Sequence, residues 1–225
     1  LEDGWRGAFS ELPRHLHDSG RTVDPPRLGQ RGSSREGRIE SATLKLERAR
    51  EIDPRSAPTL VALQQNYILQ RRYTEARDVG QAAIALVPGD INIVQWQAMG
   101  YLGQGDLKGA REVIRAAIDR GNPAPAVAAF FGGYQEVSWA LEDAERQLLF
   151  RLTPAAFDND RAWWGQTMAI AYWQQGNSAA ARAYADSALP ATAVQVAASP
   201  RDGQTHGLHA LMLAYTGKKA EAIAE

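Results

Sequence analysis

The stretch QAMGYLGQGDLKGAREVI, residues 97–114, contains four glycines close together: Gly100, Gly103, Gly105 and Gly109. Such a run is compatible with a phosphate-binding loop or with a turn between two helices. The glycine spacing is not Gly-x-Gly-x-x-Gly, and the residues before it do not read as a strand, which disfavours a nucleotide loop. The stretch therefore predicts two helices that meet in a tight corner at residues 103–106.

The same pattern recurs with a period of 34 residues. In two consecutive units a tyrosine is followed by alanines 9 and 16 positions later and then by a proline: Tyr67, Ala76, Ala83 and Pro88, then Tyr101, Ala110, Ala117 and Pro123. Further matches are Tyr172, Ala181 and Ala188, with Ala42, Ala49 and Pro54 upstream and Gly217 and Ala222 downstream. A fixed period of this length is typical of repeat proteins.

Each unit predicts two amphipathic helices joined by a short polar turn, for instance residues 57–70 and 74–87. Small residues at fixed positions let the helices approach closely, and the tyrosine fills the space beside them. The proline ends the second helix because it cannot donate a backbone hydrogen bond.

This pattern resembles the tetratricopeptide repeat (TPR), most strongly at 57–123 and 160–188 and most weakly at 124–158. Leu60, Val94 and Gly165 stand where that family usually has a tryptophan. The resemblance implies an all-α solenoid of about five helix-turn-helix units, preceded by an extension at 1–37. The expected units are about 38–56, 57–90, 91–123, 124–158 (degenerate), 160–200 and 203–225.

Two units depart from the pattern. Pro200 lies 28 residues after Tyr172, whereas Pro88 lies 21 residues after Tyr67. The extra residues amount to about two helical turns. They predict a long helix over 178–198, bent or broken at Pro190, whose projecting end is a candidate docking element. In the degenerate unit we expect helices over 124–140 and 142–151.

The N-terminal extension has a different composition. Residues 18–38 contain few apolar side chains and should not fold alone. Five arginines between positions 21 and 38 face only Asp24 and Glu36. Either this segment is a solvated linker fixed by contacts, or it docks on an acidic partner or membrane surface. Residues 4–17 suit a short helix that presents Trp5, Phe9 and Leu12, and the candidate docking residues of the extension are Trp5, Phe9, Arg27, Arg31 and Arg35.

Composition limits the function classes. The net charge of −1 argues against a dedicated nucleic-acid-binding protein, which normally carries a basic excess. The chain has no cysteine, so disulfides and thiolate metal sites are excluded. We find neither an apolar run of membrane-spanning length nor a signal peptide. The sequence reads as a soluble segment of a longer protein, and it leaves oligomeric state and compartment open: cytoplasm, periplasm or the periphery of a membrane complex.

No catalytic constellation is recognisable. The sequence lacks HExxH, Gly-x-Ser-x-Gly and Walker motifs. Glu142, Asp143 and Glu145 suit a helix start, where the helix dipole favours negative charge. We therefore expect no enzyme, cofactor or metal site, and the remaining alternative is a metal-binding enzyme that uses His206 and His209.

The resemblance implies that the first helix of each unit lines a concave groove for a peptide or helix of another protein. Val61 and Gln65 stand where some relatives clamp a carboxylate with lysine and asparagine, which argues against that mode. We expect Trp96, Trp139 and Trp164 in the core, while Trp163 and Trp173 are candidates for a binding role. The expected groove residues are Gln65, Ile68, Leu69, Asn92, Gln95, Met99, Leu102, Trp163, Gln166, Ile170, Trp173 and Gln174, with Val61 beside them.

Two further hypotheses concern biological role. The leading one is a noncatalytic interaction scaffold, such as an extrinsic subunit of a larger assembly. The alternative is a sensor or regulatory region of a longer bacterial signalling protein, a kinase or transcription regulator, because the alanine- and arginine-rich imperfect repeats resemble arrays found there.

Overall fold

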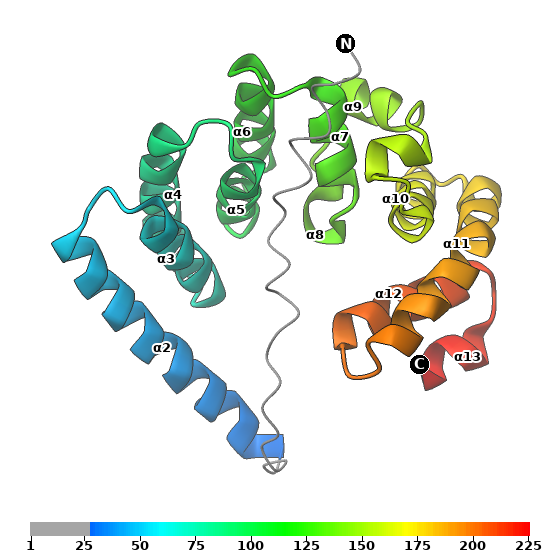
Figure 1. The fold of residues 1–225 in the computed structure, drawn as a ribbon, viewed down its shortest axis with the longest axis horizontal. Helices are drawn as coiled ribbons and strands as arrows, with labels where there is room; N and C mark the ends of the chain where they lie inside the picture. Colours follow the sequence, from blue (N-terminus) through cyan, green and yellow to red (C-terminus); the bar gives the residue numbers. More distant parts are fainter. Residues whose placement is uncertain (1–27) are drawn as a thin grey trace. The chain divides into compact units, whose positions relative to one another are not determined.

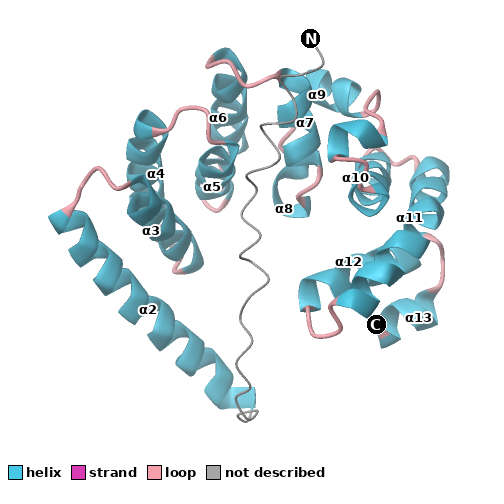
Figure 2. Ribbon diagram, in the orientation of Figure 1, coloured by secondary structure: helices cyan, strands magenta, loops and turns pink. Residues whose placement is uncertain are grey.

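The computed structural model describes residues 28–225, with side chains from residue 37 onward. All regular elements in this range are helices, joined by short loops (Figure 2). They are α2 (Leu28–Ile52), α3 (Ala57–Leu69), α4 (Tyr73–Leu86), α5 (Ile91–Leu102), α6 (Leu107–Asp119), α7 (Ala124–Gly132), α8 (Gln135–Ser138), α9 (Asp143–Leu149), the 3-10 turn η2 (Pro154–Phe157), α10 (Arg161–Gln174), α11 (Ser178–Ala198), α12 (Gly203–Tyr215) and α13 (Lys219–Ala224).

The chain divides into two compact units, Leu1–Arg38 and Ile39–Glu225. Within the second unit, consecutive helices pair as hairpins: α3 with α4, α5 with α6, α10 with α11, and α12 with α13 (Figure 1). The first helices of neighbouring hairpins also touch, since α3 contacts α5 and α10 contacts α12. Each hairpin thus packs on the next one in chain order, as the 34-residue period predicts.

Helix starts and corners follow from local sequence. Several helices begin with a side chain that accepts a backbone N–H of the first turn, which satisfies a donor that the helix leaves unpaired. These caps are Ser56, Asp90, Asp106, Asp160, Asn177 and Asp202. Gly105 turns the corner with φ of 78°, and Gly176 and Gly217 do the same in later hairpins. The glycine-rich stretch at 97–114 is therefore a helical corner, as predicted.

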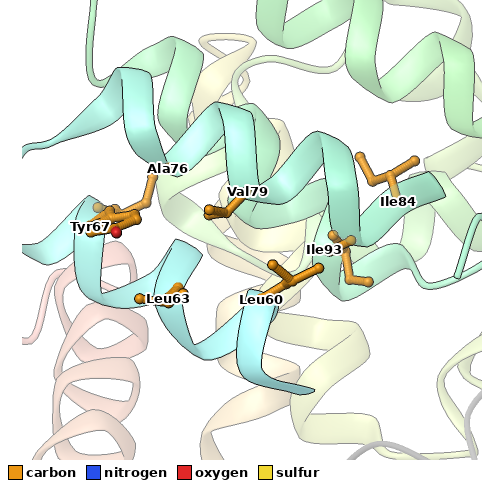
Figure 3. Packing of buried hydrophobic residues seen from close by; sticks show 9 residues of the cluster. Leu60, Leu63, Tyr67, Ala76, Val79, Ile84 and Ile93 are labelled. Carbon is orange, nitrogen blue, oxygen red and sulfur yellow. The ribbon is translucent and has the colours of Figure 1, made fainter. Parts of the chain in front are cut away.

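The core of the first hairpins joins three helices. Leu60, Leu63 and Tyr67 of α3 point toward α4 and toward Ile93 of α5 (Figure 3). Six alanines of the repeat pattern are completely buried, Ala76, Ala83, Ala110, Ala117, Ala181 and Ala188, whereas those of the outer units, Ala42, Ala49 and Ala222, are half-buried. Small side chains at these places let the two helices of a hairpin approach closely, which explains why the pattern keeps alanine there.

Tyr67 links α3 to α2. Its hydroxyl donates to Oε1 of Glu47 at 2.8 Å. Burial, followed by this hydrogen bond to a carboxylate, raises the pKa of Tyr67 from 10.0 to about 12. A raised folded-state pKa means that the phenol contributes its full stabilisation below about pH 10 and loses it as the pH rises toward 12.

We expect Tyr67→Phe to lower the free energy of unfolding by about 1 kcal/mol at pH 8, because Glu47 loses one of its two donors and keeps only Arg72. The deficit should shrink above pH 10, where unfolding of the wild type is favoured by ionisation of Tyr67. Urea unfolding of both proteins at pH 8 and pH 11 measures this. If Tyr67→Phe lowered the free energy of unfolding equally at both pH values, the pKa of Tyr67 would not be raised by folding.

The degenerate unit departs from the prediction. The helix expected over 124–140 is interrupted after Gly132, and α8 begins only at Gln135. A Cβ on Gly133 would lie 2.3 Å from Nε1 of Trp163, so the chain at Gly133 runs close against that indole. The second expected helix, 142–151, is observed as Asp143–Leu149 and starts with a capping box formed by Glu142 and Glu145.

The long helix predicted over 178–198 is confirmed, and Pro190 lies inside it without ending it. The helix α2 begins at Leu28, within the stretch assigned to the N-terminal extension. No proline occurs between residue 27 and Pro54, so nothing in that stretch blocks helix formation. The candidate docking residues Arg31 and Arg35 lie in α2, whereas Trp5, Phe9 and Arg27 lie outside the described residues.

Candidate functional site

Charge is divided between the two helices of each hairpin. The first helices, α3, α5, α7, α10 and α12, together contain one lysine, arginine or acidic residue, Arg161 at the start of α10. The second helices carry the charged side chains and form ion pairs such as Lys108–Glu112 and Arg182–Asp186. We call the solvent-exposed side chains of α3, α5, α10 and α12 the first-helix face.

The predicted groove residues fall into three groups. Leu69 and Trp173 are exposed, by 62% and 51%, and Gln174 is exposed as well. The half-buried residues are Val61, Gln65, Asn92, Met99, Leu102 and Trp163. The buried residues are Ile68, Gln95, Gln166 and Ile170, which offer little surface to a partner. Their assignment to an open groove is corrected accordingly.

Neighbouring first helices cause this burial. A Cβ on Gly100 of α5 would lie 3.6 Å from Cδ1 of Ile68, so α5 covers the α3 side chain. The helix α10 touches α7 and α12 as well as its hairpin partner α11, and Ile170 is consequently only 3% exposed. Positions that face the next hairpin are thus part of the core.

Trp173 stacks on Tyr215 of the next hairpin. The ring centroids are 4.9 Å apart and the planes are inclined by 29°. The adjacent Gln174 donates from Nε2 to Oγ of Ser138 at 2.8 Å. The C-terminal end of α10 is therefore attached on one side to α12 and on the other to α8.

Trp139 is 45% exposed, so its assignment to the core is wrong. The helix α8 ends at Ser138, and Val137, Ala140 and Leu141 occupy the buried places around it. The Trp139 indole N–H donates to the carbonyl oxygen of Glu136 at 3.0 Å. Its ring consequently lies on the surface with its donor already satisfied.

Trp96, Trp163 and Trp164 each make contacts with neighbouring residues. Trp163 packs edge-on against Phe157, with ring centroids 5.0 Å apart. Trp164 donates from Nε1 to the carbonyl oxygen of Leu152 at 3.0 Å, and Trp96 packs on the core cluster of the first hairpins. All three are partly buried. Among the tryptophans of the first-helix face, Trp173 is therefore the one that exposes most of its ring.

Sequence reasoning missed a buried polar contact and a surface aromatic residue. Gln64 Nε2 donates to Gln97 Oε1 at 3.0 Å, and Gln97 Nε2 donates to the carbonyl oxygen of Arg77 at 3.1 Å. Gly80 adjoins this contact, and a glycine inside a helix pattern was the available signal. Tyr215 occupies the same repeat position as Leu69, so the repeat offsets would have identified it.

His206 and His209 each contact a side chain from a distant part of the sequence. His209 Nδ1 lies 2.7 Å from Thr192 Oγ1 of α11, and His206 Nδ1 lies 2.7 Å from Glu225 Oε1. Within residues 28–225 no group of three or more metal-ligating side chains comes together. In the same range, none of the helices combines the length and the apolar character that crossing a lipid bilayer requires.

No protein-family model and no curated protein matches the sequence. Among solved structures, the chain is similar to a thermophilic TPR protein from Thermus thermophilus, with 22% identity over 84% of this chain and 96% of that one and a TM-score of 0.53. A TPR protein from Parabacteroides merdae gives 18% identity over 85% of this chain and 72% of that one, with a TM-score of 0.46. The similarity to the Thermus protein confirms the predicted all-α solenoid. The chain has the fold of a tetratricopeptide repeat protein.

Proposed function

We propose that this protein is a noncatalytic scaffold that binds a segment of another protein on its first-helix face. The observation that carries the proposal is the division of charge: the first helices are almost free of it, yet they expose Leu69 and Trp173. Burying a large exposed apolar side chain contributes about 1.5–3 kcal/mol, so a few such contacts support specific binding.

Amide side chains supplement these apolar contacts. Gln65 and Asn92 are half-buried on neighbouring first helices and are uncharged, and Asn92 Nδ2 already donates to Asp90 Oδ1 at 3.1 Å. A side-chain amide can both donate and accept, which matches the backbone of an extended peptide. An uncharged face does not attract a phosphate or a terminal carboxylate by long-range electrostatics, so recognition depends on shape and on hydrogen bonds.

The finer parts of the proposal concern the partner and the setting. The partner is a peptide or a helix of another protein, and the chain acts as an extrinsic subunit of a larger assembly. The chemistry that we propose is recognition without turnover.

A displayed library of random peptides selected on the full chain tests this function. We expect Leu69→Asp and Leu102→Asp each to weaken the affinity of the selected peptides at least tenfold. Each variant places a charge where the bound peptide would bury apolar surface. Arg182→Glu on α11 is the control, because that side chain is exposed on a second helix, and it should change affinity less than twofold.

Far-ultraviolet circular dichroism verifies that the variants fold. Peptides that lose affinity only with the Arg182 variant would place the binding surface on the second helices and refute the proposal. Failure to select any peptide would also count against it.

A further inference from the structure

We propose that Trp173 and Tyr215 form a docking site for an uncharged, proline-containing segment of a partner protein. This inference rests on the proposed function and specifies the partner for one part of the first-helix face. We call the two residues the aromatic pair.

The aromatic pair is preorganised. Tyr215 covers one face of the Trp173 indole, and the hydrogen bond from Gln174 to Ser138 holds the adjacent backbone. Half of the Trp173 side chain nevertheless stays exposed. A ring held in place loses little conformational freedom when it binds, which favours its use as an anchor.

The exposure of this repeat position differs between hairpins, and Leu102, which follows Tyr101, is half-buried. Trp173 comes directly after the repeat tyrosine Tyr172, as Ile68 comes after Tyr67. At that position Ile68 is only 9% exposed because the next hairpin covers it. The next hairpin also adjoins Trp173, yet it leaves 51% of the side chain in water. An exposed aromatic ring beside a hairpin junction is typical of a binding surface.

The aromatic pair offers two hydrogen-bond donors, the indole N–H and the phenol O–H, and the phenol oxygen can also accept. Neither the Trp173 indole N–H nor the Tyr215 hydroxyl has a hydrogen-bond partner among residues 37–225, whereas the indole N–H of the similarly exposed Trp139 is paired. Burial alone raises the pKa of Tyr215, so its hydroxyl remains a neutral donor. Tyr215 is half-buried, and its hydroxyl is not among the buried unpaired polar atoms of the described side chains, so it keeps access to solvent.

A proline-rich segment complements this chemistry. In the polyproline II conformation its carbonyl groups are unpaired, and its prolines lack N–H groups. Such a segment accepts hydrogen bonds from aromatic donors and stacks its rings on the indole, as in other aromatic-lined sites. A helical partner would already use its carbonyls internally. The uncharged character of α10 beyond Arg161 and of α12 does not select for charge in the partner.

The experiment uses the full chain labelled with ¹⁵N and unlabelled decaproline as the probe. We expect the indole N–H resonance of Trp173, assigned from its loss in Trp173→Phe, to shift on titration. Trp173→Ala should weaken binding at least tenfold and Trp173→Phe by less, because phenylalanine keeps a ring but no donor. Trp139→Ala is the matched control for an exposed tryptophan and should leave affinity within twofold.

Charge is tested separately. Lys218 and Lys219 follow Tyr215 closely and are exposed, so Lys218→Ala combined with Lys219→Ala should leave decaproline affinity within twofold. Raising the salt concentration from 50 to 500 mM should have as small an effect. A large loss in either case would show electrostatic recognition and overturn the inference.

Two other outcomes would also overturn it. One is that decaproline leaves the Trp173 resonance unchanged while peptides selected on Leu69 and Leu102 bind, in which case the proposed function stands without this site. The other is concentration-dependent self-association that Trp173→Ala abolishes, since the aromatic pair would then bind a second copy of the chain.

Discussion

Replacing Gly80 by alanine is expected to lower the free energy of unfolding by about 3 kcal/mol. A Cβ at this position of α4 would lie 2.0 Å from Nε2 of Gln64 and 2.1 Å from Oε1 of Gln97. These two amides are buried and bonded to each other, so they cannot move aside without leaving polar atoms unpaired. The overlap outweighs the gain of about 0.5–1 kcal/mol that alanine normally brings to a helix.

Gly207→Ala is the matched control. Gly207 also lies within a helix, α12, but it is exposed and nothing approaches its Cβ position within 4 Å. The same chemical change should therefore stabilise the protein by about 0.5–1 kcal/mol. Urea unfolding followed by circular dichroism measures both variants. If Gly80→Ala were neutral, the buried amide contact would not be a fixed part of the native state.

Leu63→Ala is expected to cost about 3 kcal/mol. Leu63 is completely buried in the core cluster, between the helices of the first hairpin and next to α5 (Figure 3). Truncation removes the free energy gained by burying the leucine side chain away from water. It also leaves a cavity between the packed helices. Because neighbouring hairpins share this cluster, the loss should appear in the main unfolding transition.

Leu69→Ala in the same helix provides the comparison. Leu69 is 62% exposed, so the same truncation should change stability by less than about 0.5 kcal/mol. Its effect should appear instead in peptide affinity. Equal destabilisation by the two truncations would mean that Leu69 is buried in solution, and it would remove Leu69 from the first-helix face.

Leu63 and Leu69 lie on the same helix, α3, but differ in burial and therefore in their expected role. Leu63 and Tyr67 hold the hairpins together, whereas Leu69 lies at the end of the helix, where no neighbouring side chain covers it fully. The same division separates Ile170 from Trp173 in α10. Variants at exposed positions should therefore change binding without unfolding the repeat array, which makes the proposed function testable apart from stability.

Much of the fold was predictable from sequence because its determinants are local. The corner at Gly105 requires a positive φ, and caps such as Asp90 and Asp106 act on the first turn of their own helices. The buried alanines recur at fixed offsets, since the two helices of each hairpin need small side chains at the same positions to pack closely. The long helix α11 was predictable from the late position of Pro200.

The candidate site was predictable only in outline. Repeat offsets selected Leu69 and Trp173, which are exposed, but they also selected Ile68 and Gln95, which the structure buries. The expectation that Trp139 lies in the core did not come from these offsets, and the structure leaves this side chain 45% exposed. Offsets give the direction of a side chain on its own helix and carry no information on how far the next helix extends over it.

The sequence by itself determined the helical hairpins, their corners and the small residues between the paired helices. These features depend on residues that are close to one another in the sequence. Tertiary structure alone decided which first-helix side chains reach water, as the stacking of Trp173 on Tyr215 and the pairing of Gln64 with Gln97 show. These contacts join residues from different hairpins. Their burial is set by distances between helices, which are fixed only when the whole array has packed.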